Sequence, residues 1–234
     1  TYDYPNYQRS DIFYNRDFRT YENNDDTRPA NGIILDFLNA DVPDVRNGIT
    51  YLKIFESVDL KDGTYNTIDN VIKDFGHPDV FIHNAVRGTR GNFMEFTSEE
   101  LQSNFDINVL ALHRIAQKVA PEMIKKKSGA IVVTGNTSAH RGKANFGGTA
   151  STKAAQKILT ESFARYLNPK GIHVAYITID AAIDLEWTRK AWPDKPDDFF
   201  IQPNDIASEV WHITHQSKSA WTFDHWLRPF GETW

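Results

Sequence analysis

The stretch from Gly129 to Lys153 contains polar side chains whose types and spacing suit the binding of a polar ligand. Thr149 and Lys153 are four residues apart at the start of a predicted helix, so a hydroxyl and an ammonium group lie one turn apart on one face. Asn136 adds an amide at the end of a predicted strand. Open α/β sheets build ligand sites where strand ends face helix starts, and we expect these groups to line such a site.

The strand and the helix that would position these groups are both visible in the sequence. Small and β-branched apolar residues from Ala130 to Val133 form a run too short for a helix core, which predicts a buried strand. Glycines and polar residues then break this run. The helix is predicted over 149–167, and Gly171 ends it.

Strands and helices alternate along the chain from Thr50 onward. A capping box at Thr97 and Glu100 predicts the start of a long helix over 98–127. Four buried strands are predicted, near 50–55, 79–83, 130–134 and 172–179. This alternation predicts an α/β fold, Rossmann-like and doubly wound, with a mostly parallel sheet and helices on both faces.

Several motifs resemble those of the short-chain dehydrogenase/reductase family, in which a strand ending in Ser is followed by a loop and by Tyr-x-x-x-Lys opening a helix. The resemblance continues through KAAQKILTESFARYLNPKGIHVAYITIDAAID, and DVFIHNA is similar to the family's strand ending in Asn-Asn-Ala-Gly. It covers roughly Thr50 to Trp234, so residues 50–234 are expected to form the family's domain and residues 1–49 an atypical N-terminal segment. The resemblance implies an NAD(P)-dependent oxidoreductase acting on a carbonyl or alcohol substrate.

The resemblance also implies roles for four residues. In the family, Tyr donates the proton, Lys lowers the pKa of the Tyr hydroxyl, Ser polarises the carbonyl group, and a helix Asn kinks its helix and holds a relay water. Asn108 and Lys153 match the family, whereas Asn136 stands at the Ser position and Thr149 at the Tyr position. An aliphatic hydroxyl is far less acidic than a phenol, so we expect an unusual or impaired proton donor.

Contacts with NAD(P) are implied for a further set of residues, namely Arg16, Asp59, Leu60, Asn84, Ala85, Lys153 and Ile183. Arg16 would lie at the tip of a strand over 11–14 and would favour the 2′-phosphate, hence NADP over NAD. The alternatives are a solvated surface charge for Arg16 and an ordinary loop acid for Asp59. Asn84 would brace the sheet as well as line the adenosine side.

The first 50 residues contain no glycine-rich turn, although a dinucleotide site needs backbone N–H groups close to the pyrophosphate. Such a fold requires a strand–turn–helix beside the strand that ends at Asn84. One interpretation is that residues 11–14 form the second strand, so that the first strand and its glycine loop are absent from this sequence. If the sequence is complete, we expect it to bind NAD(P) weakly or not at all.

The segment 185–200 occupies the family's substrate loop and is rich in aromatic residues: Trp187, Trp192, Phe199 and Phe200. These suit a bulky apolar or aromatic ligand, or a loop that packs on its own domain. The long apolar stripes of helices 98–127 and 149–167 predict a homodimer or homotetramer. Two further functions remain open: a non-catalytic binding or scaffolding relative, and a non-redox enzyme using the same pocket.

Composition excludes several other classes. The formal net charge of −5 without a basic run argues against nucleic acid as a partner. The chain has no cysteine, and His212 and His215 have no nearby carboxylate, so we expect no metal site. No apolar run approaches the roughly 18 residues of a membrane-spanning helix. We therefore expect a cytoplasmic protein with a small-molecule substrate.

Overall fold

The fold is built around one main β-sheet. The computed structural model describes residues 33–34, 51–55 and 63–232, and within them this sheet has six strands in the order β1-β2-β3-β4-β5-β8. Its strands are β1 (Ile33–Ile34), β2 (Tyr51–Phe55), β3 (Val80–His83), β4 (Ala130–Asn136), β5 (His173–Ile179) and β8 (Asp224–Leu227). β1 is antiparallel to β2, and all other neighbours are parallel. The four predicted strands therefore lie in one sheet, as expected.

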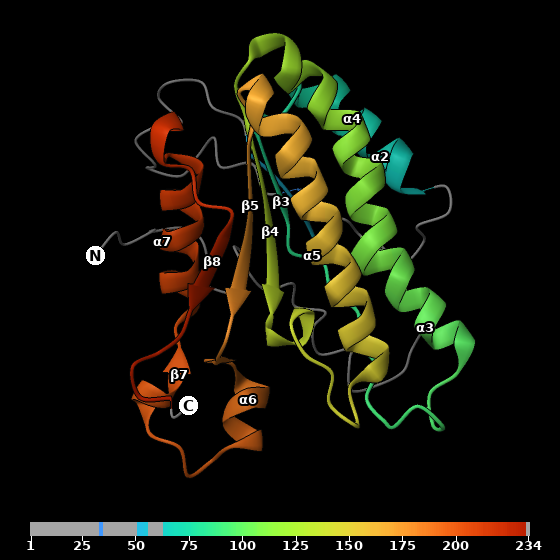
Figure 1. The fold of residues 1–234 in the computed structure, drawn as a ribbon, viewed down its shortest axis with the longest axis vertical. Coiled ribbons are helices and arrows are strands. Elements are labelled where there is room, and N and C mark those ends of the chain that lie inside the picture. The colour runs from blue at the N-terminus through green and yellow to red at the C-terminus, as the bar shows by residue number, and fades with distance from the viewer. Residues whose placement is uncertain (1–32, 35–50, 56–62, 233–234) are drawn as a thin grey trace.

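Helices cover both faces of this sheet (Figure 1). They are α2 (Gly63–Phe75), α3 (Ser98–Phe105), α4 (Ala111–Lys126), α5 (Gly147–Leu167) and α7 (Pro203–Thr214). Figure 1 shows α2, α4 and α5 on one side of the strands and α7 on the other. The predicted mostly parallel sheet with helices on both faces is confirmed.

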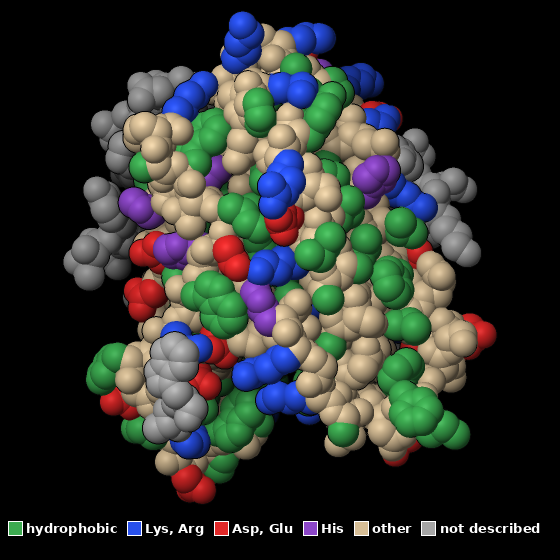
Figure 2. Space-filling view, in the orientation of Figure 1, with side chains coloured by type: hydrophobic (Ala, Val, Ile, Leu, Met, Phe, Trp, Pro, Cys, Tyr) green, Lys and Arg blue, Asp and Glu red, His purple; other side chains and the backbone are tan. Residues whose placement is uncertain are grey.

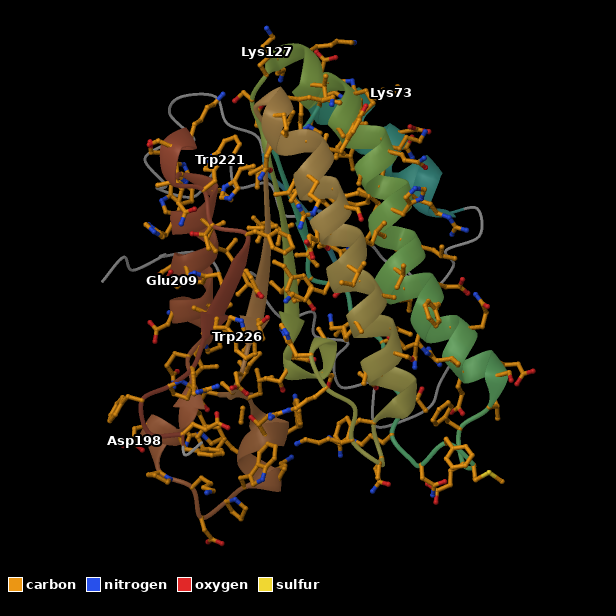
Figure 3. The ribbon with its side chains drawn as sticks, in the orientation of Figure 1. Lys73, Lys127, Asp198, Glu209, Trp221 and Trp226 are labelled. Atoms are coloured by element: carbon orange, nitrogen blue, oxygen red, sulfur yellow. The ribbon has the colours of Figure 1, made fainter. Side chains whose placement is uncertain are left out.

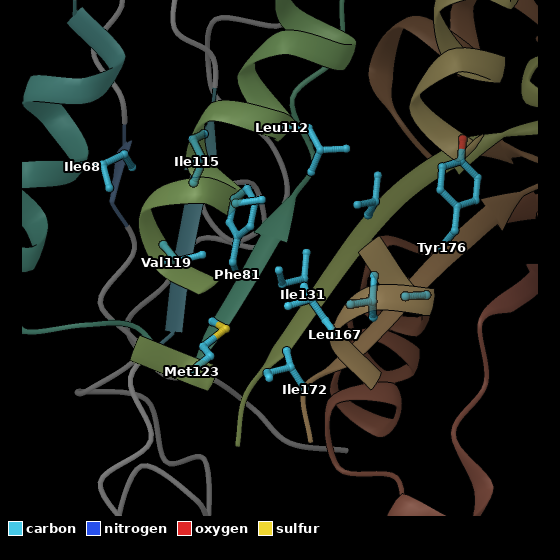
Figure 4. Close-up of a cluster of buried hydrophobic side chains, with 14 of the residues drawn as sticks. Ile68, Phe81, Leu112, Ile115, Val119, Met123, Ile131, Leu167, Ile172 and Tyr176 are labelled. Atoms are coloured by element: carbon cyan, nitrogen blue, oxygen red, sulfur yellow. The ribbon is translucent and has the colours of Figure 1, made fainter. Parts of the chain in front are cut away.

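Successive side chains along a strand point to opposite faces of the sheet, so they pack into two apolar cores, one on each face. From β4, Ile131 and Val133 join the core beneath α4 and α5, where Tyr176, Leu112 and Met123 are also buried (Figure 4). The intervening residues Ala130 and Val132 join a second core with Ile206, Val210 and Ile213 of α7. Because β4 is apolar on both faces, it reads in the sequence as a continuous apolar run.

The last crossover has the opposite hand to those before it. Strands β2, β3, β4, β5 and β8 step across the sheet in one direction, yet α2, α4 and α5 lie on one face and α7 on the other. Right-handed crossovers are the rule, so the β5–α7–β8 connection is the exception. This connection also carries a small lobe beyond the carboxyl ends of β5 and β8, built from β6 (Ala182–Ile183), α6 (Glu186–Ala191), η7 (Asp197–Phe199) and β7 (Phe200–Ile201) (Figure 1).

The helical segment between β3 and β4 contains an irregular turn at Asn108. The capping box at its start is confirmed: Thr97 N donates to Glu100 Oε2 at 2.8 Å, and Glu100 N donates to Thr97 Oγ1 at 3.2 Å. Between α3 and α4 lies one π-helical turn, η4 (Asp106–Leu110). In a π turn the N–H of residue i donates to the carbonyl of residue i−5 instead of i−4, as Ala111 N does to Asp106 O, and the carbonyl groups around the turn are reoriented. Asn108 stands inside this turn.

Two details of the C-terminal part differ from what the sequence predicts. The sequence predicts that Asn204 caps a helix from Asp205 to about His215, but α7 begins at Pro203 with Gln202 as its N-cap, because proline suits the first helical turn. The alternating pattern from Trp221 to Leu227 predicts a strand, but β8 begins at Asp224, since the 3₁₀ turn η8 (Lys218–Ala220) and a short loop precede it. At the other side of the sheet, the neighbour of β3 is β2, formed by residues 51–55.

Candidate functional site

Four of the predicted site residues lie at the carboxyl ends of β3 and β4 and at the start of α5. Asn84 follows β3, Asn136 ends β4, and Thr149 and Lys153 lie on the first turns of α5. The segment 85–91 after β3 runs against the start of α5, where Gly91 forms a parallel bridge with Phe146. The topology therefore brings together residues that are far apart in the sequence.

Thr149 is engaged by the backbone of Thr89. Its Oγ1 accepts a hydrogen bond from Thr89 N at 2.9 Å and donates one to Thr89 O at 3.0 Å. Asn104 Nδ2 adds bonds to Thr89 Oγ1 at 3.0 Å and to Gly148 O at 3.1 Å. The hydroxyl that stands at the family's Tyr position thus fastens a loop, which sequence reasoning did not anticipate.

Lys153 lies in the interior with only 2% of its surface exposed. Its Nζ donates to Thr134 O at 3.2 Å and to Gln156 Oε1 at 2.8 Å. Burial away from water disfavours the charged amine and lowers the pKa of Lys153 to about 7. An amine with this pKa can hold or release a proton near neutral pH.

Asn108 is fully buried, and its side chain bonds to two other segments. Its Nδ2 donates to Arg87 O at 2.7 Å and to Thr152 Oγ1 at 2.8 Å, while its Oδ1 accepts from Arg87 N at 2.9 Å. The backbone carbonyl of Asn108 accepts a hydrogen bond from Gln156 Nε2 at 2.7 Å. The relay water that the family resemblance implies at Asn108 stays a prediction.

Asn136 ends β4 with its side chain at the carboxyl edge. Its Oδ1 accepts from Ser138 N at 3.1 Å and so caps the 3₁₀ turn η5 (Thr137–Ala139). Its Nδ2 makes no hydrogen bond with the described part of the chain. This amide nitrogen therefore keeps its donor capacity within the described part of the chain.

The remaining predicted residues fall into three groups. Asn84 braces the sheet, since Thr134 Oγ1 on β4 donates to Asn84 Oδ1 at 2.5 Å, and Ala85 is buried beside Ile107. Ile183 lies in the lobe, where it pairs with Ile201 of β7. Arg16, Asp59 and Leu60 lie outside the described residues.

The segment 185–200 packs on its own lobe. Arg189 forms two hydrogen bonds with Asp184, at 2.6 and 2.9 Å, and one with Asp197 at 2.7 Å. Its guanidinium also stacks 4.0 Å over the ring of Phe200, which is buried. The sequence left two roles open for the aromatic residues of this segment, namely ligand binding and packing on their own domain. Phe199 and Phe200 pack against each other within the lobe. Trp187 and Trp192 keep 40% and 41% of their surface exposed.

A cavity of about 490 Å³ lies between this lobe, the start of α7 and the segment after β8. Apolar lining comes from Phe200, Leu227 and Phe230, and acidic lining includes Asp198, whose place in the lobe is labelled in Figure 3. Figure 2 shows an indentation on one face, between the lobe and the start of α5, with Lys or Arg side chains at its rim. None of the four expected catalytic residues lines the cavity.

Three polar residues that the sequence did not single out hold this site together, namely Thr89, Asn104 and Gln156. His83, the last residue of β3, is also buried. Burial and the nearby Lys153 ammonium lower the pKa of His83 to about 3, so this imidazole is neutral near pH 7. For Gln156 a signal was present, because a glutamine three residues after Lys153 faces the same side of the helix.

Metal sites and membrane-spanning helices are both absent from the described part of the chain. Within residues 33–34, 51–55 and 63–232, no group of three or more His, Asp or Glu side chains could hold a metal ion. In the same part of the chain, no helix has the length and the apolar character needed to cross a membrane.

The fold and the polar groups at the carboxyl edge of the sheet define a Rossmann-like α/β protein. Residues 48–191, more than half of the chain, match the family model of short chain dehydrogenases. The chain belongs to the short-chain dehydrogenase/reductase family.

Curated relatives agree with this assignment. The chain is similar to oxidoreductase UcpA of Salmonella typhimurium, with 33% identity over 131 residues that cover 52% of this chain and 48% of UcpA. It is 32% identical to L-xylulose reductase of Mesocricetus auratus over 138 residues, covering 58% of this chain and 55% of that protein. The chain thus spans about half the length of these relatives.

Solved structures support the fold. An alcohol dehydrogenase from the archaeon Thermococcus sibiricus, complexed with 5-hydroxy-NADP, superposes with a TM-score of 0.61 at 24% identity, covering 74% of this chain and 72% of the other. An NAD⁺-bound xylitol dehydrogenase gives a TM-score of 0.62 at 20% identity, covering 72% and 74%. At these identities the likeness concerns the fold.

Proposed function

We propose that this chain is part of an NAD(P)-dependent oxidoreductase that interconverts a carbonyl group and an alcohol in a small molecule. The family assignment supports this, together with one observation in the site. Lys153 and Asn108, the two residues that match the family's motifs, are joined through Gln156 at the carboxyl edge of the sheet.

The described residues fit the nicotinamide end of such a cofactor. An ammonium group has three donors, of which Lys153 uses two, and the amide nitrogen of Asn136 is available for a carbonyl oxygen. Lys153 would hold the ribose hydroxyls, and Ile183 and Asn84 would flank the cofactor. The nicotinamide, when bound, supplies or accepts a hydride.

The chain's own residues would orient the substrate and manage the proton. Asn136 would donate to the substrate oxygen as an electrostatic stabiliser. Thr149 is a poor acid, and its hydroxyl already donates to Thr89 O. Proton transfer is therefore expected to be slow, and Lys153, whose pKa is about 7, would hold or release the proton near neutral pH.

The finer assignments rest on the sequence. We propose NADP over NAD because Arg16 suits a 2′-phosphate, and weak binding by this chain alone because its first 50 residues lack a glycine-rich turn. A bulky, apolar substrate would suit the exposed Trp187 and Trp192. We also propose that the chain self-associates as a dimer or tetramer.

The proposal is tested by titrating NADPH and NADH into the protein and by assaying carbonyl reduction. Thr149→Tyr together with Asn136→Ser restores the family's donor pair, and a positioned acid typically contributes 10²- to 10⁴-fold. We expect a gain of up to about that factor, which a further Lys153→Met substitution should abolish. Brisk reduction by the unmodified protein would show that a different residue is the acid. Cofactor binding without any gain in the double variant would replace the oxidoreductase with a binding role.

A further inference from the structure

Gln156 joins the amine of Lys153 to the π turn of the neighbouring helix. Its Oε1 accepts from Lys153 Nζ at 2.8 Å, and its Nε2 donates to the Asn108 carbonyl at 2.7 Å. Gln156 has no exposed surface, and Lys153 is 2% exposed. The bridge is therefore a buried, continuous connection between α5 and η4.

The local structure explains why this bridge forms. Residues three apart on a helix face the same side, so Gln156 lies beside Lys153. The π turn reorients the carbonyl groups around Asn108 toward the neighbouring helix. A buried amide without partners would cost free energy, so an amide satisfied at both ends is held in one orientation.

We propose that Gln156 is a positioning residue that fixes the Lys153 amine and separates it from the Asn108 carbonyl of η4. The family resemblance implies a relay water at Asn108, whereas the connection from the Asn108 carbonyl to the amine runs through the Gln156 amide. Water passes protons along a hydrogen-bonded chain, whereas an amide would first have to become an imidic acid. Protons therefore reach Lys153 from the carboxyl edge of the sheet, where Asn136 and Thr149 lie.

The surroundings of Lys153 make Gln156 its principal polar partner. Besides Gln156 Oε1 at 2.8 Å, the amine bonds the Thr134 carbonyl of β4 at 3.2 Å. The titratable group that faces the amine from β3 is His83, which is neutral near pH 7. A charge introduced at position 156 would therefore act on Lys153 directly.

The first experiment measures the pKa of Lys153 by NMR of ¹³C-labelled lysine in the cofactor-free protein. Gln156→Glu places an opposite charge beside the amine and is expected to raise this pKa by about 1 to 3. Gln156→Met keeps the side-chain length but removes the acceptor, and is expected to lower it. Gln117→Met, at an exposed position of α4, is the matched control and should leave it unchanged. An unchanged pKa in both Gln156 variants would overturn the proposal.

A second measurement needs no variant. Hydrogen exchange of the side-chain amides in the unmodified protein is expected to be at least about tenfold slower at Gln156 than at exposed Gln117, because both ends of the Gln156 amide are bonded inside the protein. Equal exchange rates would contradict the bridge. The bearing of the bridge on catalysis rests on the proposed function, but neither measurement requires cofactor. A protein that binds no NAD(P) and still shows these results retains the bridge and loses only the oxidoreductase proposal.

Discussion

The hydroxyl of Thr149 and the backbone of Thr89 form a reciprocal pair, in which Oγ1 accepts from Thr89 N at 2.9 Å and donates to Thr89 O at 3.0 Å. This pair ties the segment after β3 to the first turn of α5. Asn104 and Asn108 add side-chain bonds to the same segment. A residue at the expected proton-donor position thus acts as a structural clamp.

Thr149→Val should loosen this clamp. The substitution keeps the branched shape but leaves both backbone groups of Thr89 without their partner, at a cost of about 1 kcal/mol where water can partly replace it. Hydrogen exchange at Thr89 should accelerate, while Thr149→Ser should retain protection. Equal protection in all three proteins would show that the pair contributes little.

The buried amine of Lys153 should make the protein more stable at alkaline pH. Its pKa is about 7 in the folded protein, against about 10.4 in an unfolded chain. Between these values the unfolded state binds more protons, so the free energy of unfolding rises with pH through this window. Denaturant unfolding from pH 7 to 10 should show this rise, and Lys153→Met should reduce it. Parallel curves for the two proteins would indicate an ordinary lysine.

The effects on stability of substitutions at Gly135 and at Tyr176 should be coupled. A Cβ on Gly135 would overlap the phenol ring of Tyr176, which is fully buried. Gly135→Ala should therefore destabilise the protein by about 3 kcal/mol or more, as overpacking of a core does. In a double-mutant cycle, Tyr176→Leu should recover part of this loss. Additive effects of the two substitutions would contradict the contact.

Tyr176→Phe should be neutral or stabilising. The Oη atom of Tyr176 is buried and has no hydrogen-bond partner among the described residues. Removing an unsatisfied buried hydroxyl relieves a cost of about 1–3 kcal/mol. Thermal unfolding should show an equal or higher Tm. A clear loss of stability would indicate a partner for this hydroxyl.

The lobe around Arg189 should loosen in acid. Hydrogen bonds from Arg189 hold the pKa of Asp184 below its usual range. The stabilisation is therefore fully present above about pH 3.9, the ordinary Asp value, and is lost as the pH falls through the lower folded value. Fluorescence of Trp187 and Trp192 should report this change. Arg189→Met should destabilise the lobe and show the loosened signal already at neutral pH. Arg165→Met, in an exposed pair with Glu161, is the control.

Self-association through the outer face of α5 remains a prediction. Ile158 and Tyr166 on this helix keep 62% and 61% of their surface exposed. Sedimentation at micromolar concentration should show a dimer or larger species, and Ile158→Glu should shift it toward the monomer. Phe75→Glu, on α2, should not. A monomer in the unmodified protein would refute the prediction.

The sequence by itself determined the sheet and its helices. Apolar runs such as the one from Ala130 to Val133 and caps such as Thr97 with Glu100 are local signals, so strands and helix starts can be predicted from neighbouring residues. The same local pattern brought Asn136, Thr149 and Lys153 to the end of one strand and the start of one helix.

Only the tertiary structure decided what these side chains contact. The partner of Thr149 is Thr89, sixty residues away, and the carbonyl that Gln156 binds belongs to Asn108, forty-eight residues away. Such pairs form only when crossovers bring α5, η4 and the segment after β3 together. Burial then set the pKa of Lys153, because desolvation depends on the whole surrounding fold and not on the residues beside it in the chain.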